Sequence, residues 1–294
     1  MINYLEQTYF VVDTVINLFI TVFFFYKAIA TNSYWYILLS AYGEYKLGYI
    51  GHEGCHGAIP KIYKYLFDLI LGSSEQWSMK HNKGHHIHTN KEKDPDVDLM
   101  PFMRLKDYQP LKWYHRYQHI YQYFLFPFAI FRLRGYGIIY LYKKYDLRRV
   151  LLQLVVYIPG IYLFIIYPMR QHGGWGLIFY LLHNMYISFA FGVIFSISHV
   201  NSKSKFDEKE TNFEQIQLNE TADWCPGSYI ANYLTGGLNH QVVHHLHPRI
   251  SSYHYPRMMY EIKKKYGSKY NRFDSFFDII KSNYLYMRKM GSVR

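Results

Sequence analysis

The chain has 294 residues, half of them hydrophobic, with 33 Tyr, 21 Phe and only 18% charged residues. This composition excludes a disordered or collagen-like chain, and the length suits one or two domains. The two cysteines, Cys55 and Cys225, are too few for a disulfide-stapled scaffold or a cysteine-rich metal site. The net charge of +12 favours anionic partners such as lipid surfaces, nucleotides or acidic proteins, and the 16 histidines are the unusual feature.

Four apolar stretches are long enough to cross a bilayer, which takes about 20 residues. They are residues 9–28, 33–51, 150–169 and 175–197. Because Glu44 and Lys46 lie within the second stretch, and charges are costly inside a membrane, we expect them to face other helices or the end of the span. The shorter apolar runs 62–72 and 121–131 are predicted to be interfacial or re-entrant helices.

Positive charge is strongly segregated along the chain. Of the 33 Lys and Arg residues, 30 lie in residues 51–150 and 200–294. Since positive charge accumulates on the cytoplasmic side, four crossings place both termini and the loop after residue 51 in the cytoplasm. We therefore predict one all-α integral membrane domain over residues 1–294, with four transmembrane helices and a cytoplasmic helical cap formed by residues 52–149 and 198–294.

Histidines gather in three clusters, all on the predicted cytoplasmic side. The first, in GHEGCHGA, contains His52 and His56, which share one face of a helix about 6 Å apart along its axis. The second, in WSMKHNKGHHIHTN, contains His81, His85 and His86, with His88 nearby. The third, in GGLNHQVVHHLHP, contains His244 and His245 shortly after His240 and Gln241, and His199 ends the fourth predicted span.

A single histidine is more often a hydrogen-bonded core or surface residue than a metal ligand. The clusters together are a different matter, because a His-x3-His-His arrangement is rare by chance and this chain contains it twice. Eight imidazoles exceed the three or four ligands of one zinc ion and suffice for two metal ions. Imidazole suits iron, copper and zinc alike, so the residues alone leave the metal open.

These clusters, their order and their relation to the spans resemble the membrane-bound fatty acid desaturases. More narrowly, WSMKHNKGHHIHTN followed by DPDVD, and GGLNHQVVHHLHPRISSYHYP, are similar to front-end (linoleoyl-CoA, delta-6-like) desaturases, in which the third box begins with Gln. The resemblance extends from about residue 40 to the closing FDIIKSNYLYMRKMG.

The resemblance implies a centre of two iron ions that uses dioxygen as co-substrate. Carried over by position, its ligands are His52, His56, His81, His85, His86, His199, His244 and His245, with Gln241 as a further ligand and His240 as its alternative. Asp94, Asp96 and Asn239 match polar positions near the boxes. We expect them to orient imidazole N–H groups, the alternative for the two aspartates being a solvated turn.

The implied function is an oxygen-dependent acyl desaturase that introduces a cis double bond into an acyl-CoA or acyl-lipid chain. Trp77, Trp224 and Asn184 are candidates to line its acyl tunnel, and Asn184 is alternatively an interhelical hydrogen-bonding residue. A related di-iron lipid hydroxylase or a sphingolipid desaturase shares the same metal chemistry. His52, Glu53 and His56 also satisfy the HExxH pattern of zinc metalloproteases, a reading that leaves the other two clusters without a role.

Each turnover of such an enzyme needs two electrons. The chain contains no His-Pro-Gly-Gly haem motif of a fused cytochrome b5 domain. The resemblance therefore predicts a separate electron donor, cytochrome b5 or a ferredoxin, whose acidic surface complements the positive charge. We expect a multi-pass membrane protein of the endoplasmic reticulum if eukaryotic or of the cytoplasmic membrane if bacterial, with the lipid bilayer and no nucleic acid as partner.

Overall fold

The computed structural model describes residues 4–292 except 71, 98, 145–146, 148–150 and 152–156. The described chain is mostly helical, as the sequence predicts. It forms two compact units: unit 1 comprises residues 1–77 and 126–191, and unit 2 comprises residues 78–125 and 192–294. Both units therefore combine segments that lie far apart in the sequence.

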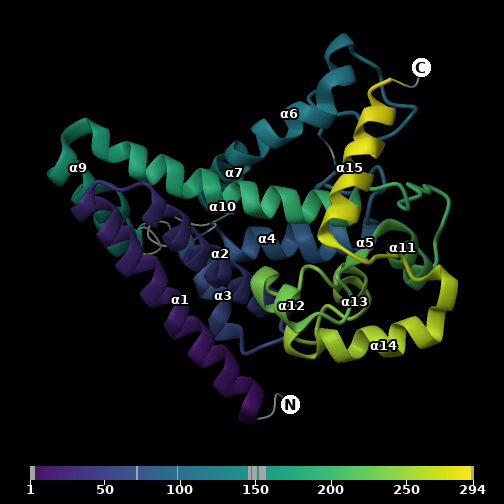
Figure 1. Cartoon of the computed structure of the whole chain (residues 1–294), viewed down its shortest axis with the longest axis horizontal. Helices are drawn as coiled ribbons and strands as arrows, with labels where there is room; N and C mark the ends of the chain where they lie inside the picture. Colours follow the sequence, from purple (N-terminus) through teal and green to yellow (C-terminus); the bar gives the residue numbers. More distant parts are fainter. Residues whose placement is uncertain are drawn as a thin grey trace. The chain divides into compact units, whose positions relative to one another are not determined.

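Unit 1 is built around two long helices, α1 (Tyr4–Thr31) and α2 (Trp35–His56), which pack along each other (Figure 1). Its other elements are the 3-10 turn η1 (Lys61–Tyr63), α3 (Lys64–Ile70), α4 (Ser74–Lys80), the 3-10 turn η4 (Phe126–Phe128), α7 (Ala129–Lys144), the π-turn η5 (Tyr162–Ile166), α9 (Tyr167–His172), the 3-10 turn η6 (Gly173–Trp175) and α10 (Gly176–His199). The unit boundaries fall within α4 and α10, so the last residues of these two helices belong to unit 2.

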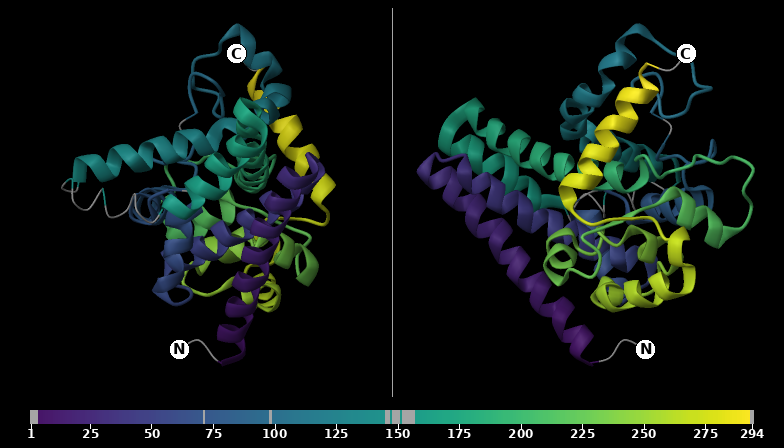
Figure 2. Two further views of the ribbon diagram at one scale, coloured as in Figure 1. Left: turned by 90° about the vertical axis from the view of Figure 1, so that its left-hand side faces the viewer. Right: turned by 45° about the vertical axis from the view of Figure 1, so that its right-hand side comes forward.

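The surface of α1 is inverted relative to that of a helix from a water-soluble protein. Asp13, Asn17 and Thr21, spaced four residues apart, are buried on one face, whereas Val15 and Phe19 are each 61% exposed. The buried stripe faces α2, where the ammonium of Lys46 lies 3.3 Å from the carboxylate of Asp13. Both views in Figure 2 show α1 as one long, unbroken helix. A polar inner face and an apolar outer face are typical of a helix in contact with lipid.

Three described stretches are long and apolar enough to cross a membrane: Tyr4–Thr31, Trp113–Lys144 and Tyr157–His199. The first contains the predicted span 9–28, and the third contains the predicted span 175–197 together with residues 157–169. Residues 150 and 152–156 of the predicted span 150–169 lie outside the described residues.

Two of these findings differ from the sequence-based expectation. The predicted span 33–51 forms α2 but is not among the three stretches, because Glu44, Lys46 and several tyrosines lower its mean hydropathy. The run 121–131, predicted to be too short to span, lies instead within the continuous helical stretch Trp113–Lys144. Helix on both sides of the run supplies the extra length, which the run alone lacks.

The charged residues of α2 face neighbouring helices, as expected. Glu44 lies 3.4 Å from the guanidinium of Arg134 and 3.3 Å from His183 Nδ1, and the other ring nitrogen of His183 lies 2.9 Å from the hydroxyl of Ser40. Asn184 accepts a hydrogen bond from Arg134. These groups satisfy one another, which is what polar side chains among apolar helices require.

Unit 2 consists of shorter helices around a two-strand pair. Its elements are the π-turn η2 (His81–His85), α5 (His86–His88), the 3-10 turn η3 (Trp113–Tyr117), α6 (Gln118–Leu125), α11 (Phe213–Glu220), β1 (Asp223–Trp224), α12 (Tyr229–Thr235), α13 (Gln241–Leu246), the 3-10 turn η7 (Ser252–His254), α14 (Tyr255–Tyr266), the 3-10 turn η8 (Gly267–Lys269), β2 (Arg272–Phe273) and α15 (Phe276–Met290). The parallel strands pair Asp223 with Arg272 and Trp224 with Phe273. In Figure 1, α15 runs beside α6, and the amide of Gln122 donates to Asn283 across this contact.

The core of unit 2 supports α13, the helix of the third histidine cluster. Val242 and Val243 are completely buried and pack with Leu218 of α11 and with Tyr255 and Met259 of α14. The valines occupy one side of α13, so Gln241, His244 and His245, which follow an i, i+3, i+4 pattern, share the other. Hydrophobic packing thus decides which way the histidines point.

Candidate metal centre

The second cluster lies on a π-helical turn. His81 begins η2, and His86 follows it five residues later, a spacing that diverges around an ordinary α-helix. The wider π-turn has i to i+5 hydrogen bonds and aligns these two residues, so that their Nε2 atoms lie 3.2 Å apart. Two imidazole nitrogens bound to one ion at about 2.1 Å are separated by about 3.0–3.4 Å, so this spacing fits a shared metal.

A tight turn after the second cluster brings a carboxylate to His85. Gly84 allows the approach, because a Cβ at this position would lie 2.9 Å from the ring of Pro95. Asp94 is completely buried and lies 2.8 Å from Nδ1 of His85, and it also accepts hydrogen bonds from the backbone amides of Asn90 and Asp96. A carboxylate held in this way keeps the proton on Nδ1, so the lone pair on Nε2 is available to bind a metal ion.

Histidines from three separate elements meet inside unit 2. One ring nitrogen from each of His85, His199 and His245 lies within 4.8 Å of the other two, and all three side chains are buried. A second group of the same kind consists of His86, His244 and His245. The three elements are the second cluster, the end of α10 and α13, so residues more than 150 positions apart converge in space.

The buried nitrogens of this group are positioned for a ligand. Within the described residues, Nε2 of His85 and Nε2 of His245 have no hydrogen-bond partner, and neither has the side-chain oxygen of Gln241. Leaving one buried polar atom unsatisfied costs about 1–3 kcal/mol, so three together indicate a group that binds there. Nitrogen donors that are neutral and buried suit iron, copper or zinc, and the residues present therefore fit a metal ion.

Electrostatics favour the neutral, metal-binding form of His245. Burial, reinforced by the imidazole of His86, lowers the pKa of His245 well below its usual value. Burial likewise opposes a charge on His85, but the adjacent carboxylate of Asp94 outweighs it and raises the pKa of His85. A neutral imidazole is the form that binds metal, and a carboxylate partner makes it a stronger donor.

The first cluster belongs to unit 1. His52 and His56 lie in the last turn of α2, and their Nε2 atoms are 3.1 Å apart. This separation again fits two nitrogens on one ion. Glu53, the general base that a metalloprotease would need, is buried, and its carboxylate accepts a hydrogen bond from the hydroxyl of Tyr49.

His240 and Gln241 have different surroundings. Nε2 of His240 accepts from the backbone amide of Gly227, and its Nδ1 lies 3.0 Å from the side-chain oxygen of Asn232. Both ring nitrogens of His240 are therefore used by the protein. Gln241 instead lies beside a candidate ligand, since its amide nitrogen is 2.9 Å from Nε2 of His199.

Of the two other predicted polar partners, Asp96 lies beside an imidazole and Asn239 does not. Asp96 pairs with Lys80, and its carboxylate lies 3.6 Å from Nδ1 of His81. Asn239 donates to the backbone carbonyl of Trp224. Among the hydrogen bonds of the described residues, none joins Asn239 to an imidazole; it supports the loop that leads into α13.

The tunnel candidates belong to different units: Trp77 and Asn184 to unit 1, and Trp224 to unit 2. Trp77 packs in the core of unit 1, with its ring 6.3 Å from that of His52. Trp224 is buried in unit 2 against Phe276. Asn184 hydrogen-bonds Arg134 and the carbonyl of Tyr180, which matches the alternative reading as an interhelical hydrogen-bonding residue.

Two residues beside the histidines were not found from the sequence. The hydroxyl of Tyr255 lies 3.1 Å from Nδ1 of His244, and the side-chain oxygen of Gln217 lies 2.8 Å from Nδ1 of His245. Tyr255 falls within the quoted SYHYP segment, which is a signal that could have been used. Gln217, in FEQIQLNE, carries no local signal, because only folding brings α11 to α13.

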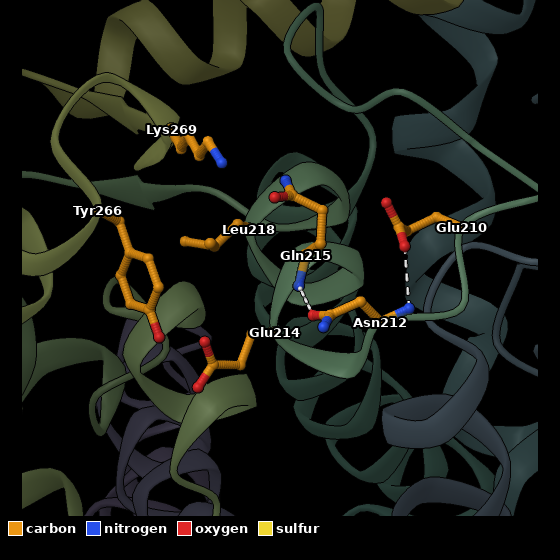
Figure 3. A pocket seen from close by; sticks show the side chains of 7 residues that line it. All are labelled: Glu210, Asn212, Glu214, Gln215, Leu218, Tyr266 and Lys269. Atoms are coloured by element: carbon orange, nitrogen blue, oxygen red, sulfur yellow. Dashed lines mark hydrogen bonds between the residues drawn. The ribbon is translucent and has the colours of Figure 1, made fainter.

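A surface hollow in unit 2 is separate from these histidines. Glu210, Glu214, Gln215, Tyr266 and Lys269 are among its lining residues (Figure 3). Figure 3 also shows Asn212 accepting from the backbone amide of Gln215, which caps α11. Its lining contains no histidine, so this hollow is not the metal centre.

Comparison with known proteins gives matches to desaturases. The family model described as fatty acid desaturase matches residues 16–277. The Delta(5) fatty acid desaturase A of Dictyostelium discoideum is 32% identical over 82% of this chain and 59% of its own length. The acyl-lipid (8-3)-desaturase B of the same organism is 28% identical, covering 94% of this chain and 69% of its own length.

A third relative is similar over a comparable range. The sn-1 linoleoyl-lipid 6-desaturase of Arthrospira platensis is 27% identical over 86% of this chain and 77% of its own length. The chain spans about three fifths of the length of the Delta(5) relatives that it matches. Because the family model covers most of the sequence, this chain belongs to the fatty acid desaturase family.

Proposed function

We propose that this protein is an oxygen-dependent acyl desaturase that introduces a cis double bond into a fatty acyl chain. The observation that carries the proposal is the buried convergence of His85, His199 and His245 in a chain of the desaturase family. The names of two relatives specify delta-5 and 6-desaturation, which supports a front-end enzyme.

The proposed cofactor is a pair of iron ions. The donors are the three clusters and His199: His52, His56, His81, His85, His86, His199, Gln241, His244 and His245. When bound, the irons supply, together with dioxygen, the oxidising power that removes two hydrogens from adjacent methylene groups. Two imidazoles on α2 are fewer than the three or four protein ligands of a typical site, so an ion at His52 and His56 would need further donors.

The chain's own residues prepare the donors. Asp94 holds the Nδ1 proton of His85, so that Nε2 faces the metal. The complete burial of His81, His244 and His245 excludes bulk water, which would otherwise compete for the open positions. His240 serves this centre indirectly by fixing the loop before α13, and Gln241 is the residue of the pair that we assign to the metal.

The proposed substrate is an acyl chain carried by a lipid, with an acyl-CoA as the alternative. Two of the relatives are named acyl-lipid and linoleoyl-lipid desaturases, which favours the lipid-bound form. The proposed topology has four crossings, with both termini and the metal centre in the cytoplasm, supported by the segregation of Lys and Arg. A separate acidic electron donor, cytochrome b5 or a ferredoxin, fits the charge of +12.

Two measurements test the function. Metal analysis of the purified protein should find two irons per chain, whereas one zinc per chain would indicate the metalloprotease reading. Expression in yeast supplied with candidate acids should yield new double bonds, mapped by mass spectrometry. A hydroxylated product would instead identify the related di-iron hydroxylase.

Matched variants connect the two measurements. His244→Ala should lose iron and product together, because it removes a proposed ligand. His88→Ala is the control: it lies in the same segment as the second cluster but belongs to none of the metal-binding groups. If both variants retain iron and activity, the proposed centre is wrong.

A further inference from the structure

Gln217 joins the second and third histidine clusters through a single buried amide. It extends from α11, and its side chain is completely buried, as is that of Thr89, which follows the second cluster. Its amide nitrogen donates to the backbone carbonyl of His86 at 3.0 Å. Its amide oxygen accepts from the hydroxyl of Thr89 at 2.8 Å and lies 2.8 Å from Nδ1 of His245.

The carbonyl of His86 determines which way this amide points. A carbonyl oxygen can only accept, so the end of the Gln217 side chain that contacts it must be the NH₂ group. The oxygen end is then the one that faces His245. Because that oxygen can only accept, Nδ1 of His245 must carry the proton and donate it.

These hydrogen bonds determine which nitrogen of His245 can bind a metal ion. A neutral imidazole carries one proton, so a protonated Nδ1 leaves the lone pair on Nε2. Nε2 of His245 is also one of the buried nitrogens that have no hydrogen-bond partner within the described residues. The ring centroids of His86 and His245 lie 4.2 Å apart, so the two rings stack. The amide of Gln217 contacts both residues of this pair: its oxygen accepts from Nδ1 of His245, and its nitrogen donates to the backbone carbonyl of His86.

We infer that Gln217 is a positioning residue for the proposed metal centre: it locks the tautomer and orientation of His245 and couples the third cluster to the backbone of the second. The inference rests on the proposed function, because it needs a metal ion for the orphaned Nε2 to bind. Asp94 does the equivalent for His85, with a carboxylate in place of an amide. The two partners come from different elements, so each can be changed separately.

The test measures ferrous iron binding to the purified, detergent-solubilised full chain, in competition with a chelator under anaerobic conditions. Gln217→Leu removes both the acceptor and the donor, and iron affinity should fall about 10- to 100-fold, the usual effect of losing the partner of a ligating histidine. Gln217→Glu keeps the acceptor for His245 but loses the donor to His86, so it should recover most of that affinity. A carboxylate partner also makes Nε2 of His245 a stronger metal ligand, which should shift the Mössbauer spectrum of the bound iron.

The control is Gln215→Leu, the same change on the same helix but at a half-buried position away from the histidines. It should bind iron as the unmodified protein does. Thermal unfolding of each variant separates loss of fold from loss of the ligand orientation, because iron affinities are compared for the folded proteins, below the unfolding temperature of each variant. If Gln217→Leu binds iron as tightly as Gln215→Leu, or if Gln217→Glu recovers nothing, the positioning role is wrong. If the unmodified chain itself binds no iron, the proposed function fails instead.

Discussion

Replacing Gly51 by alanine tests how closely α2 approaches α3 just before the first histidine cluster. A Cβ at Gly51 would lie 2.5 Å from the backbone nitrogen of Phe67 and 2.9 Å from its Cα. Carbon atoms in contact are ordinarily about 3.5–4.0 Å apart, so the two helices must separate by about 1 Å. Backbone atoms cannot rotate away as a flexible side chain can, and overpacking of this kind typically costs about 1–3 kcal/mol.

The helix itself gains from the same substitution. Alanine is favoured over glycine inside a helix by about 0.5–1 kcal/mol, which offsets part of the clash at Gly51. Gly135 of α7 provides the matched control, because an added Cβ there meets no atom of the described residues within 4 Å. Gly135→Ala should therefore gain stability, Gly51→Ala should lose it, and the two should differ by about 1–3 kcal/mol.

Thermal unfolding of the two purified variants in the same detergent, followed by intrinsic fluorescence, measures the difference. For a protein of this size about 1 kcal/mol changes the Tm by about 2–4 °C, so a gap of several degrees is expected. Equal Tm values would refute the close approach of α2 and α3. Iron content of Gly51→Ala adds a second readout, because His52 follows directly in the helix that must move.

Three further outcomes are expected. Burial raises the pKa of Asp223 to about 7. Folding therefore retains a proton that the unfolded chain releases above its usual pKa of about 4, and the contribution of Asp223 to stability falls as the pH rises from 4 to 7. The Tm of the unmodified protein minus the Tm of Asp223→Asn should therefore be larger at pH 5 than at pH 8. A difference that does not change with pH would count against this. Arg134→Leu should destabilise the protein by about 1–3 kcal/mol in denaturation assays, because Glu44 loses its cationic neighbour among apolar helices; an unchanged stability would show that this contact is unimportant. His240→Ala should lower the Tm while keeping iron, in contrast to His244→Ala, and loss of iron from His240→Ala alone would reverse our assignment of the two residues.

Short-range spacing accounts for what could be predicted about the site. His52 and His56, or Gln241, His244 and His245, share a helix face because their separation in sequence equals one helical turn. No tertiary information is needed for that inference. The same reasoning does not reach His86, whose alignment with His81 depends on a π-turn that no local pattern predicts.

Membrane-spanning segments show the corresponding limit. The apolar composition of residues 9–28 was sufficient to identify α1 as long enough to span. The run 121–131 was not identified, because the length of a helix depends on where it begins and ends, and Trp113–Lys144 continues through residues that are not apolar themselves. Glu44 and Lys46 are tolerated in α2 because other helices supply their partners.

The amino-acid sequence by itself determined the family, the histidine clusters and the mainly helical character, since each depends on residue identity and on spacing within a few turns. Only the tertiary structure decided that His240 bonds to the protein while Gln241 lies beside His199, and that Gln217 is the partner of His245. These contacts join residues brought together from separate helices, and the orientation of a buried ring depends on what packs against it, which no short stretch of sequence contains.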